Sequence, residues 1–521
     1  MSDKTILVPV DGASNIKLEA LDFETLATVA SAVTASPKAE HDGLQYNDTG
    51  AELDWFDEAI RGLAHSCRHA AAVAPVARGA SGGLVGADNS LAEAPPRRLT
   101  LAYTQGYPEA VNEAFAALAG SREEFFQETG SIRDFPGSLT LLKRFVYEEM
   151  ERPAVLARSK AFAHYGALLG GHFLGDDYLA AVAAAGNEHS YWMCHSGTRN
   201  VQAAPGTPSR AAGKVASFRR LVPAEASVCY KPIGTMPASQ AQALALAGRP
   251  VVVSGGHDTC LSHIPILSTF YQAYPQAAGK PVLHVEAGTW TMIAQVGGSS
   301  PLAGDGFTRD VIIQGTVDGQ NVVTARYGGG ADFACLKKLA QDKGKGMQGR
   351  WDPAALVRLL RAGDCFATPN VNPANRGTGP FPQCQGRVIG EQAFLGDAAV
   401  AYMACNLLTA LTTAQQVQAI AQDADVPIVL TAGGSKDPLF AALLAAATGR
   451  AVYAMFDKDG QAVTETTTLG AAIVGKAACL NVHPYEVDTA PLGVRYRQVD
   501  ALPAEAVEAL KGYREKWLRH C

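Results

Sequence analysis

The segment from residue 251 to residue 263, VVVSGGHDTCLSH, constrains the fold of this chain more than any other stretch. Its valine run predicts a β-strand, because β-branched residues favour extended backbone. Gly255 and Gly256 follow and allow a sharp turn with close backbone approach. His257 and Asp258 come where a helix can begin, so the segment predicts a strand-to-helix corner. Ligands of open α/β sheets bind at such corners.

Asp258 has two interpretations at this corner. Aspartate is among the preferred N-cap residues, so Asp258 could simply cap the following helix. It could also present a carboxylate to a ligand at the edge of the sheet. The local sequence does not separate the two interpretations, and the turns elsewhere in the chain favour the second.

The chain as a whole has the composition of a globular protein with more than one domain. Its 521 residues exceed what one hydrophobic core usually serves, and we expect two domains, residues 1–267 and 268–521. A net charge of −6 without a Lys/Arg-rich block argues against nucleic acid as a partner. The cysteines are scattered without a C-x-x-C pair, and no apolar stretch is long enough to cross a bilayer. With no signal-peptide pattern at the N-terminus, we expect a cytoplasmic protein without membrane association.

Two turns in different halves of the chain are small and contain a hydroxyl. Residues 12–14 (Gly-Ala-Ser) and residues 288–289 (Gly-Thr) each lie between two predicted strands. The backbone amides of such turns can face a phosphate, although any β-hairpin needs similar residues. Each half thus begins with a predicted hairpin, which hints at internal duplication.

A third turn, residues 433–437, follows a predicted strand and precedes a predicted helix at residues 438–448. Pro438 suits the first helical position and Gly449 suits the stop. The free amides at this helix start can meet a nucleotide. The P-loop and G-x-G-x-x-G fingerprints are both absent, which disfavours a Walker ATPase and a Rossmann dehydrogenase.

Taken together, these segments resemble the FGGY family of carbohydrate kinases, in the sugar kinase, hsp70 and actin superfamily. Residues 254–259 resemble the family's Gly-Gly-His-Asp-Thr segment with the catalytic aspartate. Residues 287–291 (Ala-Gly-Thr-Trp-Thr) are similar to the Ser-Gly-Thr-Trp-Ser phosphate turn of the L-fuculokinase and rhamnulokinase branches. Residues 432–437 are similar to the adenine-side Gly-Gly-Gly-Ser-Lys-Asn turn, and residues 465–472 to the Glu-x-x-x-x-Gly-Ala-Ala block. The motifs occur in the family's order over nearly the whole chain.

The resemblance implies an α/β fold of two actin-like (ribonuclease H-like) domains. Each domain would have a mixed central sheet flanked by helices, with the active site in the interdomain cleft. Residues 1–267 would form the sugar-binding domain and residues 268–521 the nucleotide-binding domain, with ATP and Mg²⁺ as cofactors. Asp258 would be the catalytic base that accepts the proton of the sugar hydroxyl. The residues that the resemblance assigns to ATP are Gly12, Ala13, Ser14, Lys17, Gly288, Thr289, Gly433, Gly434, Ser435 and Asp437. Those that it assigns to the sugar are Tyr103, Gln105, His257 and Asp258.

The first turn departs from the family pattern. Residues 12–17 resemble the family's Gly-Ala-Thr-Asn-Val-Arg turn, but Val10 stands where the family has an aspartate, and Asp11 directly precedes the turn. Either Asp11 takes the metal-linked role after a one-residue shift, or that role is vacant. Lys17 replaces the usual arginine, which keeps the charge and loses the bidentate fork. The family's Trp-x-Asp-x-Arg sugar loop appears here as residues 103–107, Tyr-Thr-Gln-Gly-Tyr, so the identity of the sugar does not carry over.

We therefore expect an enzyme that uses ATP to phosphorylate a hydroxyl, a terminal primary one, of a ketose or related polyol. One alternative is a catalytically impaired relative that senses sugar or nucleotide, which the Val10 and Gln105 departures motivate. Another is a chaperone-type or polymer-forming ATPase of the same superfamily, against which stands the lack of a separate peptide-binding domain. The expected partner is a small-molecule sugar, and a homodimer is one alternative for the oligomeric state.

Overall fold

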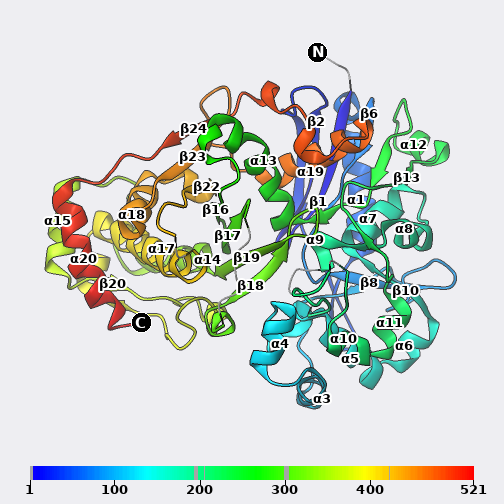
Figure 1. Cartoon of the computed structure of the whole chain (residues 1–521), viewed down its shortest axis with the longest axis horizontal. Coiled ribbons are helices and arrows are strands. Elements are labelled where there is room, and N and C mark those ends of the chain that lie inside the picture. The colour runs from blue at the N-terminus through cyan, green and yellow to red at the C-terminus, as the bar shows by residue number, and fades with distance from the viewer. Residues whose placement is uncertain (1–3, 193–196, 205, 299–303, 422) are drawn as a thin grey trace. The chain divides into compact units, whose positions relative to one another are not determined.

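The computed structural model describes residues 4–192, 197–204, 206–298, 304–421 and 423–521. The chain forms two compact units, whose elements are labelled in Figure 1. The first unit contains Met1–Thr269, Ile313–Asn321 and Glu465–Gly493, and the second contains Phe270–Ile312, Val322–Thr464 and Val494–Cys521. The chain therefore passes between the units several times, and the predicted boundary after residue 267 stays a prediction.

The first unit is built on a mixed β-sheet in the strand order β13-β14-β6-β1-β2-β3. These strands are β1 (Thr5–Asp11), β2 (Asn15–Asp22), β3 (Thr28–Ala35), β6 (Ala70–Val73), β13 (Pro232–Thr235) and β14 (Val251–Val253). The strands β1, β2 and β3 are antiparallel, whereas β6 is parallel to β1 and β14 is parallel to β6. Two short strands extend the parallel part: β7 (Val76–Ala77) pairs with β1, and β15 (Gly256–His257) pairs with β7.

The helices that pack against this sheet include α1 (Thr49–Gly62) against β2, α7 (Tyr165–Phe173) against β7 and β14, and α19 (Thr466–Leu480) against β1, β6 and β14. The apolar side chains Leu53, Phe56 and Ile60 of α1 recur at helical spacing and are fully buried. In α19, Gly475 permits close approach to the sheet, because a Cβ there would lie 2.9 Å from the Ile6 side chain.

The remaining elements of the first unit surround this core. Three small sheets are formed by β4 (Lys38–His41), β5 (Leu44–Asn47) and β9 (Thr100–Leu101); by β8 (Gly82–Gly86) and β10 (Ser159–His164); and by β11 (Asn187–Glu188) and β12 (Ala226–Ser227). The further helices are α2 (Ala64–Cys67), α3 (Glu109–Ala119), α4 (Arg122–Thr129), α5 (Leu141–Glu151), α6 (Pro153–Arg158), α8 (Tyr178–Ala185), α9 (His189–Trp192), α10 (Arg210–Lys214), α11 (Ala216–Leu221) and α12 (Ala238–Ala243). The helix α13 (Asp258–Ala273) begins in this unit, directly after β15.

The second unit has a sheet in the order β18-β19-β17-β16-β22-β23-β24. Its strands are β16 (Val282–Ala287), β17 (Thr291–Val296), β18 (Val311–Gly315), β19 (Asn321–Tyr327), β22 (Ile428–Ala432), β23 (Val452–Phe456) and β24 (Arg495–Gln498). The helix α17 (Ala398–Ile420) contacts β17 and lies between α14 (Gly329–Lys343) and α18 (Pro438–Thr448) in Figure 1. The outer elements are α15 (Pro353–Ala362), α16 (Glu391–Gly396), α20 (Ala504–Leu518) and the strand pair β20 (Phe366–Ala367) and β21 (Val388–Ile389).

The two sheets share one topology over six strands. In β3-β2-β1-β6-β14-β13 and in β19-β17-β16-β22-β23-β24, the successive pairs are antiparallel, antiparallel, parallel, parallel and antiparallel. The predicted mixed α/β class is confirmed. The hairpins β1–β2 and β16–β17 occupy equivalent places in the two sheets.

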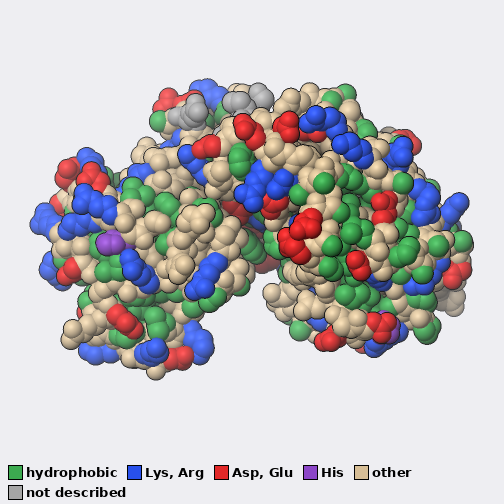
Figure 2. All heavy atoms as spheres, turned by 90° about the horizontal axis from the view of Figure 1, so that it is seen from below, with side chains coloured by type: hydrophobic (Ala, Val, Ile, Leu, Met, Phe, Trp, Pro, Cys, Tyr) green, Lys and Arg blue, Asp and Glu red, His purple; other side chains and the backbone are tan. Residues whose placement is uncertain are grey.

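The surface carries charges of both signs. On the face shown in Figure 2, acidic and basic side chains are mixed with apolar ones, in keeping with the net charge of −6. Among the described residues, no helix combines the length and the apolar character that crossing a bilayer requires.

Candidate active site

The carboxyl ends of three parallel strands meet in the first unit. The register pairs Val10 of β1 with Val76 of β7, and Ala77 of β7 with His257 of β15. The next residues along these neighbouring strands include Arg78 and Asp258, beside the turn that follows β1. This is the edge of an α/β sheet where ligands bind. The fold thus brings the predicted base Asp258 close to a cation that the sequence reasoning did not single out.

Asp258 is the first residue of α13, and its side chain is 43% exposed. Its Oδ1 accepts the backbone N–H of Thr259 at 2.7 Å and lies 3.0 Å from Nε2 of His257. An N-cap side chain accepts from a residue two or three positions into the helix, and this bond goes to the adjacent residue. No hydrogen bond to Oδ2 is seen among the described residues. The carboxylate is therefore held through one oxygen and keeps the other for a ligand.

A buried chain of hydrogen bonds holds the residue before Asp258. The backbone N–H of His257 donates to Oγ of Ser190 at 3.1 Å, and the Ser190 hydroxyl donates to Glu188 at 2.8 Å. Glu188 is fully buried and also accepts the backbone N–H groups of Ser190 and Tyr191, both at 2.9 Å. Burial raises the pKa of Glu188 to about 7, against the opposing effect of these donors. Burial also lowers the pKa of His257, which favours its neutral ring beside Asp258.

The turn between β1 and β2 is narrow. The N–H of Gly12 donates to the carbonyl of Asn15 at 3.1 Å, and a Cβ at Gly12 would lie 2.5 Å from that oxygen. Ala13 and Ser14 are exposed at its tip. Lys17 lies on β2, with Nζ 3.2 Å from Glu19 and 2.5 Å from Glu465. Burial would lower the pKa of Lys17, but these two carboxylates outweigh it and raise the pKa.

Asp11 faces the protein interior. It is fully buried, with Oδ2 2.8 Å from Nε of Arg78 and Oδ1 2.6 Å from Nη2. Among the described residues there is no group of three or more His, Cys, Asp or Glu side chains arranged to hold a metal ion. Both oxygens of Asp11 already contact a guanidinium group, so Asp11 as placed does not fit a Mg²⁺ ligand. Its expected metal role stays a prediction, and this ion pair counts against it.

Tyr103, which was expected to contact the sugar, lines a cavity of the first unit. That cavity has a volume of about 480 Å³ and also includes Lys38, Asn47 and Arg78. Gln105 instead joins two loops, because its Oε1 accepts the N–H of Gln45 and its Nε2 donates to the carbonyl of Gly106, both at 2.7 Å.

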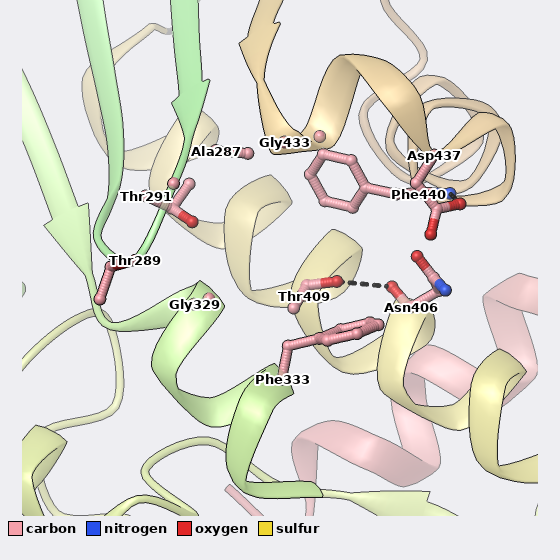
Figure 3. Close-up of a pocket in the computed structure, with 13 residues that line it drawn as sticks. Ala287, Thr289, Thr291, Gly329, Phe333, Asn406, Thr409, Gly433, Asp437 and Phe440 are labelled. Carbon is pink, nitrogen blue, oxygen red and sulfur yellow. Dashed lines mark hydrogen bonds between the residues drawn. The ribbon is translucent and has the colours of Figure 1, made fainter. Parts of the chain in front are cut away.

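The second unit contains a cavity of about 350 Å³ at the equivalent end of its sheet (Figure 3). Its walls come from the β16–β17 turn, the start of α14, the middle of α17 and the segment after β22. The lining residues are Ala287, Gly288, Thr289, Thr291, Gly329, Gly330, Phe333, Asn406, Thr409, Gly433, Gly434, Asp437 and Phe440. Five residues predicted to bind nucleotide are thus brought together: Gly288, Thr289, Gly433, Gly434 and Asp437.

Hydrogen bonds between residues close in the chain fix the conformation of the segment after β22. Ser435 is not among the residues that line this cavity, and its hydroxyl donates to the carbonyl of Ala432 at 2.7 Å. Asp437 caps α18 by accepting the N–H groups of Leu439 and Phe440, and it also accepts the hydroxyl of Tyr402 at 2.7 Å. Asp437 therefore shapes the cavity wall as well as lining it.

Two aromatic rings and one amide complete this cavity. Phe333 of α14 and Phe440 of α18 project into it from different walls in Figure 3. Asn406 of α17 donates from Nδ2 to the carbonyl of Tyr402 at 3.1 Å, which orients its amide. Aromatic rings beside an amide suit a planar heterocycle with polar edges. Sequence reasoning missed these three residues, and no local motif marks them, since each lies within an ordinary helical pattern.

Comparison with known proteins gives a family match for part of the chain. Residues 280–480 match the family profile described as "Carbohydrate kinase FGGY, C-terminal domain". No match was found among curated protein sequences.

Solved structures resemble the chain over almost its full length. A carbohydrate kinase from Novosphingobium aromaticivorans has a TM-score of 0.74 at 20% identity, covering 99% of this chain and 97% of that one. A gluconate kinase from Lactobacillus acidophilus has a TM-score of 0.75 at 14% identity, with the same coverage. A glycerol kinase from Plasmodium falciparum, solved with ADP, has a TM-score of 0.72 at 10% identity, covering 99% of this chain and 98% of that one. Residues 280–480 thus match the C-terminal domain of the FGGY carbohydrate kinases, within a chain whose fold resembles that of these solved kinases.

Proposed function

We propose that the chain is an FGGY carbohydrate kinase that transfers the γ-phosphoryl group of ATP to a hydroxyl of a ketose or related polyol. The acceptor is a terminal primary hydroxyl. The observation that carries this proposal is Asp258, a half-exposed carboxylate at the carboxyl end of a parallel strand, held through one oxygen by Thr259 and His257. The sequence of the Ala287–Thr291 turn supports a place near the L-fuculokinase and rhamnulokinase branches.

Phosphoryl transfer depends on positioning and on charge stabilisation more than on covalent help from the protein. Asp258 accepts the proton of the sugar hydroxyl as its oxygen attacks the γ-phosphorus, and the bond to the ADP oxygen breaks. Neutral His257 orients the carboxylate, and Ser190 and Glu188 hold His257. The cavity with Phe333 and Phe440 accommodates the adenine, and the turn at residues 288–289 contacts the phosphates.

A second function is favoured by one specific observation. Val10 stands in the place of the family's aspartate, and the neighbouring Asp11 forms an ion pair with Arg78. A protein that binds sugar and nucleotide without turnover, as a sensor, would tolerate this arrangement.

A screen for ADP release separates the two functions. The panel contains ketopentoses, ketohexoses, 6-deoxyketohexoses, tetritols and sugar acids, each with ATP and Mg²⁺. We expect turnover with at least one acceptor, and a loss of about 10²- to 10⁴-fold in kcat for Asp258→Asn, the usual contribution of a general base. Asp459→Asn, at an exposed carboxylate in the second unit, is the matched control. Binding of acceptor without turnover would support the sensor, and near-normal turnover by Asp258→Asn would exclude Asp258 as the base.

A further inference from the structure

Two cysteines that are far apart in the chain meet in the second unit. Cys384 lies in the segment between β20 and β21, and Cys521 follows the helix α20. A hydrogen bond joins the two thiols, and Sγ of Cys384 lies 4.0 Å from the carbonyl oxygen of His520, the residue before Cys521. Both cysteines are free thiols. The fold thus brings together a pair of thiols that the scattered cysteine pattern of the sequence does not reveal.

The two thiols differ in their charge. The hydrogen bond with Cys521 lowers the pKa of Cys384 to about 7; burial opposes this shift, and a hydrogen bond with Thr368 and the charge of Arg387 add to it. The same bond between the thiols raises the pKa of Cys521, so Cys521 keeps its proton. About half of the Cys384 thiols are therefore ionised near pH 7. The pair combines a nucleophilic thiolate with a protonated thiol, as reactive and resolving cysteines do.

The cysteine pair lies just beneath the surface. Cys384 is 6% exposed, but the residues on both sides of it are exposed, and Cys521 is partly exposed. Cys67 and Cys365 differ, because burial raises their pKa to about 11 and keeps them protonated at neutral pH. An oxidant as small as hydrogen peroxide can therefore reach a thiolate at Cys384.

Tertiary contacts hold both cysteines in place. Near Cys521, Trp517 of α20 donates from Nε1 to the carbonyl of Ala367 at 2.9 Å, and its ring meets that of Phe381 edge-on, with centroids 5.4 Å apart. In the segment with Cys384, Nδ2 of Asn370 donates to the carbonyl of Phe381 at 2.9 Å and to that of Cys384 at 3.1 Å. The end of α20 and the segment with Cys384 are thus packed against each other.

Asn370 also links the cysteine pair to the cavity that Phe333 lines. The backbone N–H of Asn370 donates to Oδ2 of Asp332 at 2.8 Å, and Nδ2 of Asn375 donates to Oδ1 of the same carboxylate at 2.8 Å. Asp332 lies in the first turn of α14, directly before Phe333. A continuous path of hydrogen bonds therefore runs from the backbone of Cys384 to the wall of the cavity.

We propose that Cys384 and Cys521 form a reversible disulfide in the presence of a peroxide, and that this disulfide weakens nucleotide binding in the cavity that Phe333 lines. The second part rests on the proposed function, because it takes this cavity as the nucleotide site. Forming the bond draws the two sulfurs closer than a hydrogen bond does. The carbonyl of Cys384 moves with its side chain, which disturbs its hydrogen bond with Asn370 and displaces the start of α14.

The reaction balances with hydrogen peroxide as the oxidant. The Cys384 thiolate attacks one oxygen of the peroxide, the O–O bond breaks, and the products are a sulfenic acid at Cys384 and hydroxide. The sulfur of Cys521 then attacks the Cys384 sulfur, the S–O bond breaks, and the released oxygen leaves as water with the Cys521 proton. The hydroxide takes up the proton that Cys384 lost on ionisation. In total, two thiols and one peroxide give one disulfide and two waters, and an added dithiol reverses the disulfide.

Peptide mapping by mass spectrometry tests the disulfide on the full chain. The reduced protein is treated with hydrogen peroxide and digested without reductant. We expect a cross-link between Cys384 and Cys521 that dithiothreitol removes. In Cys521→Ser, the sulfenic acid at Cys384 should persist and react with dimedone. Cys335→Ser, at a partly exposed cysteine of α14, is the matched control and should keep the cross-link. The absence of this cross-link in the wild type, or the same cross-linked mass in Cys521→Ser, would overturn the proposal.

Calorimetry with ADP tests the effect on the nucleotide and does not depend on turnover. Oxidation should raise Kd for ADP by about 5-fold or more in the wild type and in Cys335→Ser, and leave it unchanged in Cys521→Ser. Equal Kd values for the reduced and the cross-linked wild type would overturn the effect on nucleotide binding. A cross-linked protein whose reduced form binds no ADP would support the disulfide and overturn the proposed function of the cavity.

Discussion

The two sheets share six strands in the same order, but the residues at the ends of their parallel strands differ in charge and size. In the first unit, the parallel strands β7 and β15 end at Arg78 and Asp258, and Asp11 at the end of β1 forms a buried ion pair with Arg78. In the second unit, the equivalent strand β22 ends at Ala432 and Gly433, beside a cavity lined by small and aromatic residues. Topology sets where a ligand can bind in each sheet, and the side chains at the strand ends set which ligand it is.

This difference separates two tasks. A charged, hydrogen-bonding edge suits a polar acceptor molecule and a general base. An edge of glycines approached by Phe333 and Phe440 leaves room for a flat heterocycle. Four substitutions test this difference between the two units.

Breaking the ion pair of the first unit should have the largest effect. Arg78→Met leaves the Asp11 carboxylate buried without a partner and should lower the free energy of unfolding by about 3–5 kcal/mol. Gly433→Ala, at the equivalent strand end, adds a Cβ 3.3 Å from the carbonyl of Ala287 and should cost about 1 kcal/mol. Urea unfolding measures both. The double variant Asp11→Asn with Arg78→Met should recover part of the loss, and equal losses in the two units would contradict the contrast.

The corner of Asp258 should respond to pH through Glu188. Its pKa is about 7 in the folded protein and 4.5 as the ordinary value, so the folded state holds the proton more tightly. The stability that this group contributes is therefore fully present below about pH 4.5 and is lost as the pH rises to about 7, with an amplitude of about 3 kcal/mol. Glu188→Gln should remove this component of the pH dependence of unfolding. An identical pH slope in the variant and the wild type would exclude Glu188 as the source.

We expect the ring of Phe333 in the second unit to affect binding of the nucleotide and not binding of the acceptor. Phe333→Ala removes a ring of the cavity and should raise KM for ATP by about 5- to 100-fold, the range expected when a base loses an aromatic stacking partner. KM for the acceptor should stay unchanged. Phe456→Ala is the control, because that ring packs against Arg497 and does not line the cavity. A shift in acceptor KM alone would reverse the assignment of the two units.

The smallest effect concerns backbone strain at the strand end of the second unit. Ala432 has φ of 57° and ψ of −147°, a conformation that only glycine adopts readily. Ala432→Gly should raise the free energy of unfolding by about 1 kcal/mol, once the greater flexibility of unfolded glycine is subtracted. Ala77→Gly, at the end of β7 in the first unit, should lower it, since Ala77 has no positive φ. A loss of stability in both variants would contradict the strain.

Elements whose ends are set by residues next to them in the chain could be predicted from the sequence. The helix expected at residues 438–448 has those bounds, because Pro438 and Gly449 mark its ends and Asp437 caps it. The strand before Gly255 and the helix start at Asp258 are also as the sequence predicts, whereas the short strand β15 at Gly256–His257 was not predicted. Backbone preferences of single residues decide such features, so neighbouring positions in the chain carry the information.

The partners of these elements were not predictable in the same way. Arg78 meets Asp11 from 67 positions away, and Ser190 meets His257 over the same separation. Neither Arg78 nor Glu188 lies in a recognisable motif, and Phe333, Asn406 and Phe440 come from three different helices.

The sequence alone determined the three turns and the aspartate at the helix start, because glycine, proline and capping residues act on the backbone beside them. Tertiary packing pairs Asp11 with Arg78, places Glu188 behind the Asp258 corner and brings two phenyl rings to one cavity. Burial and long-range pairing set the charge and the orientation of these groups, and both arise only when strands and helices distant along the chain pack together.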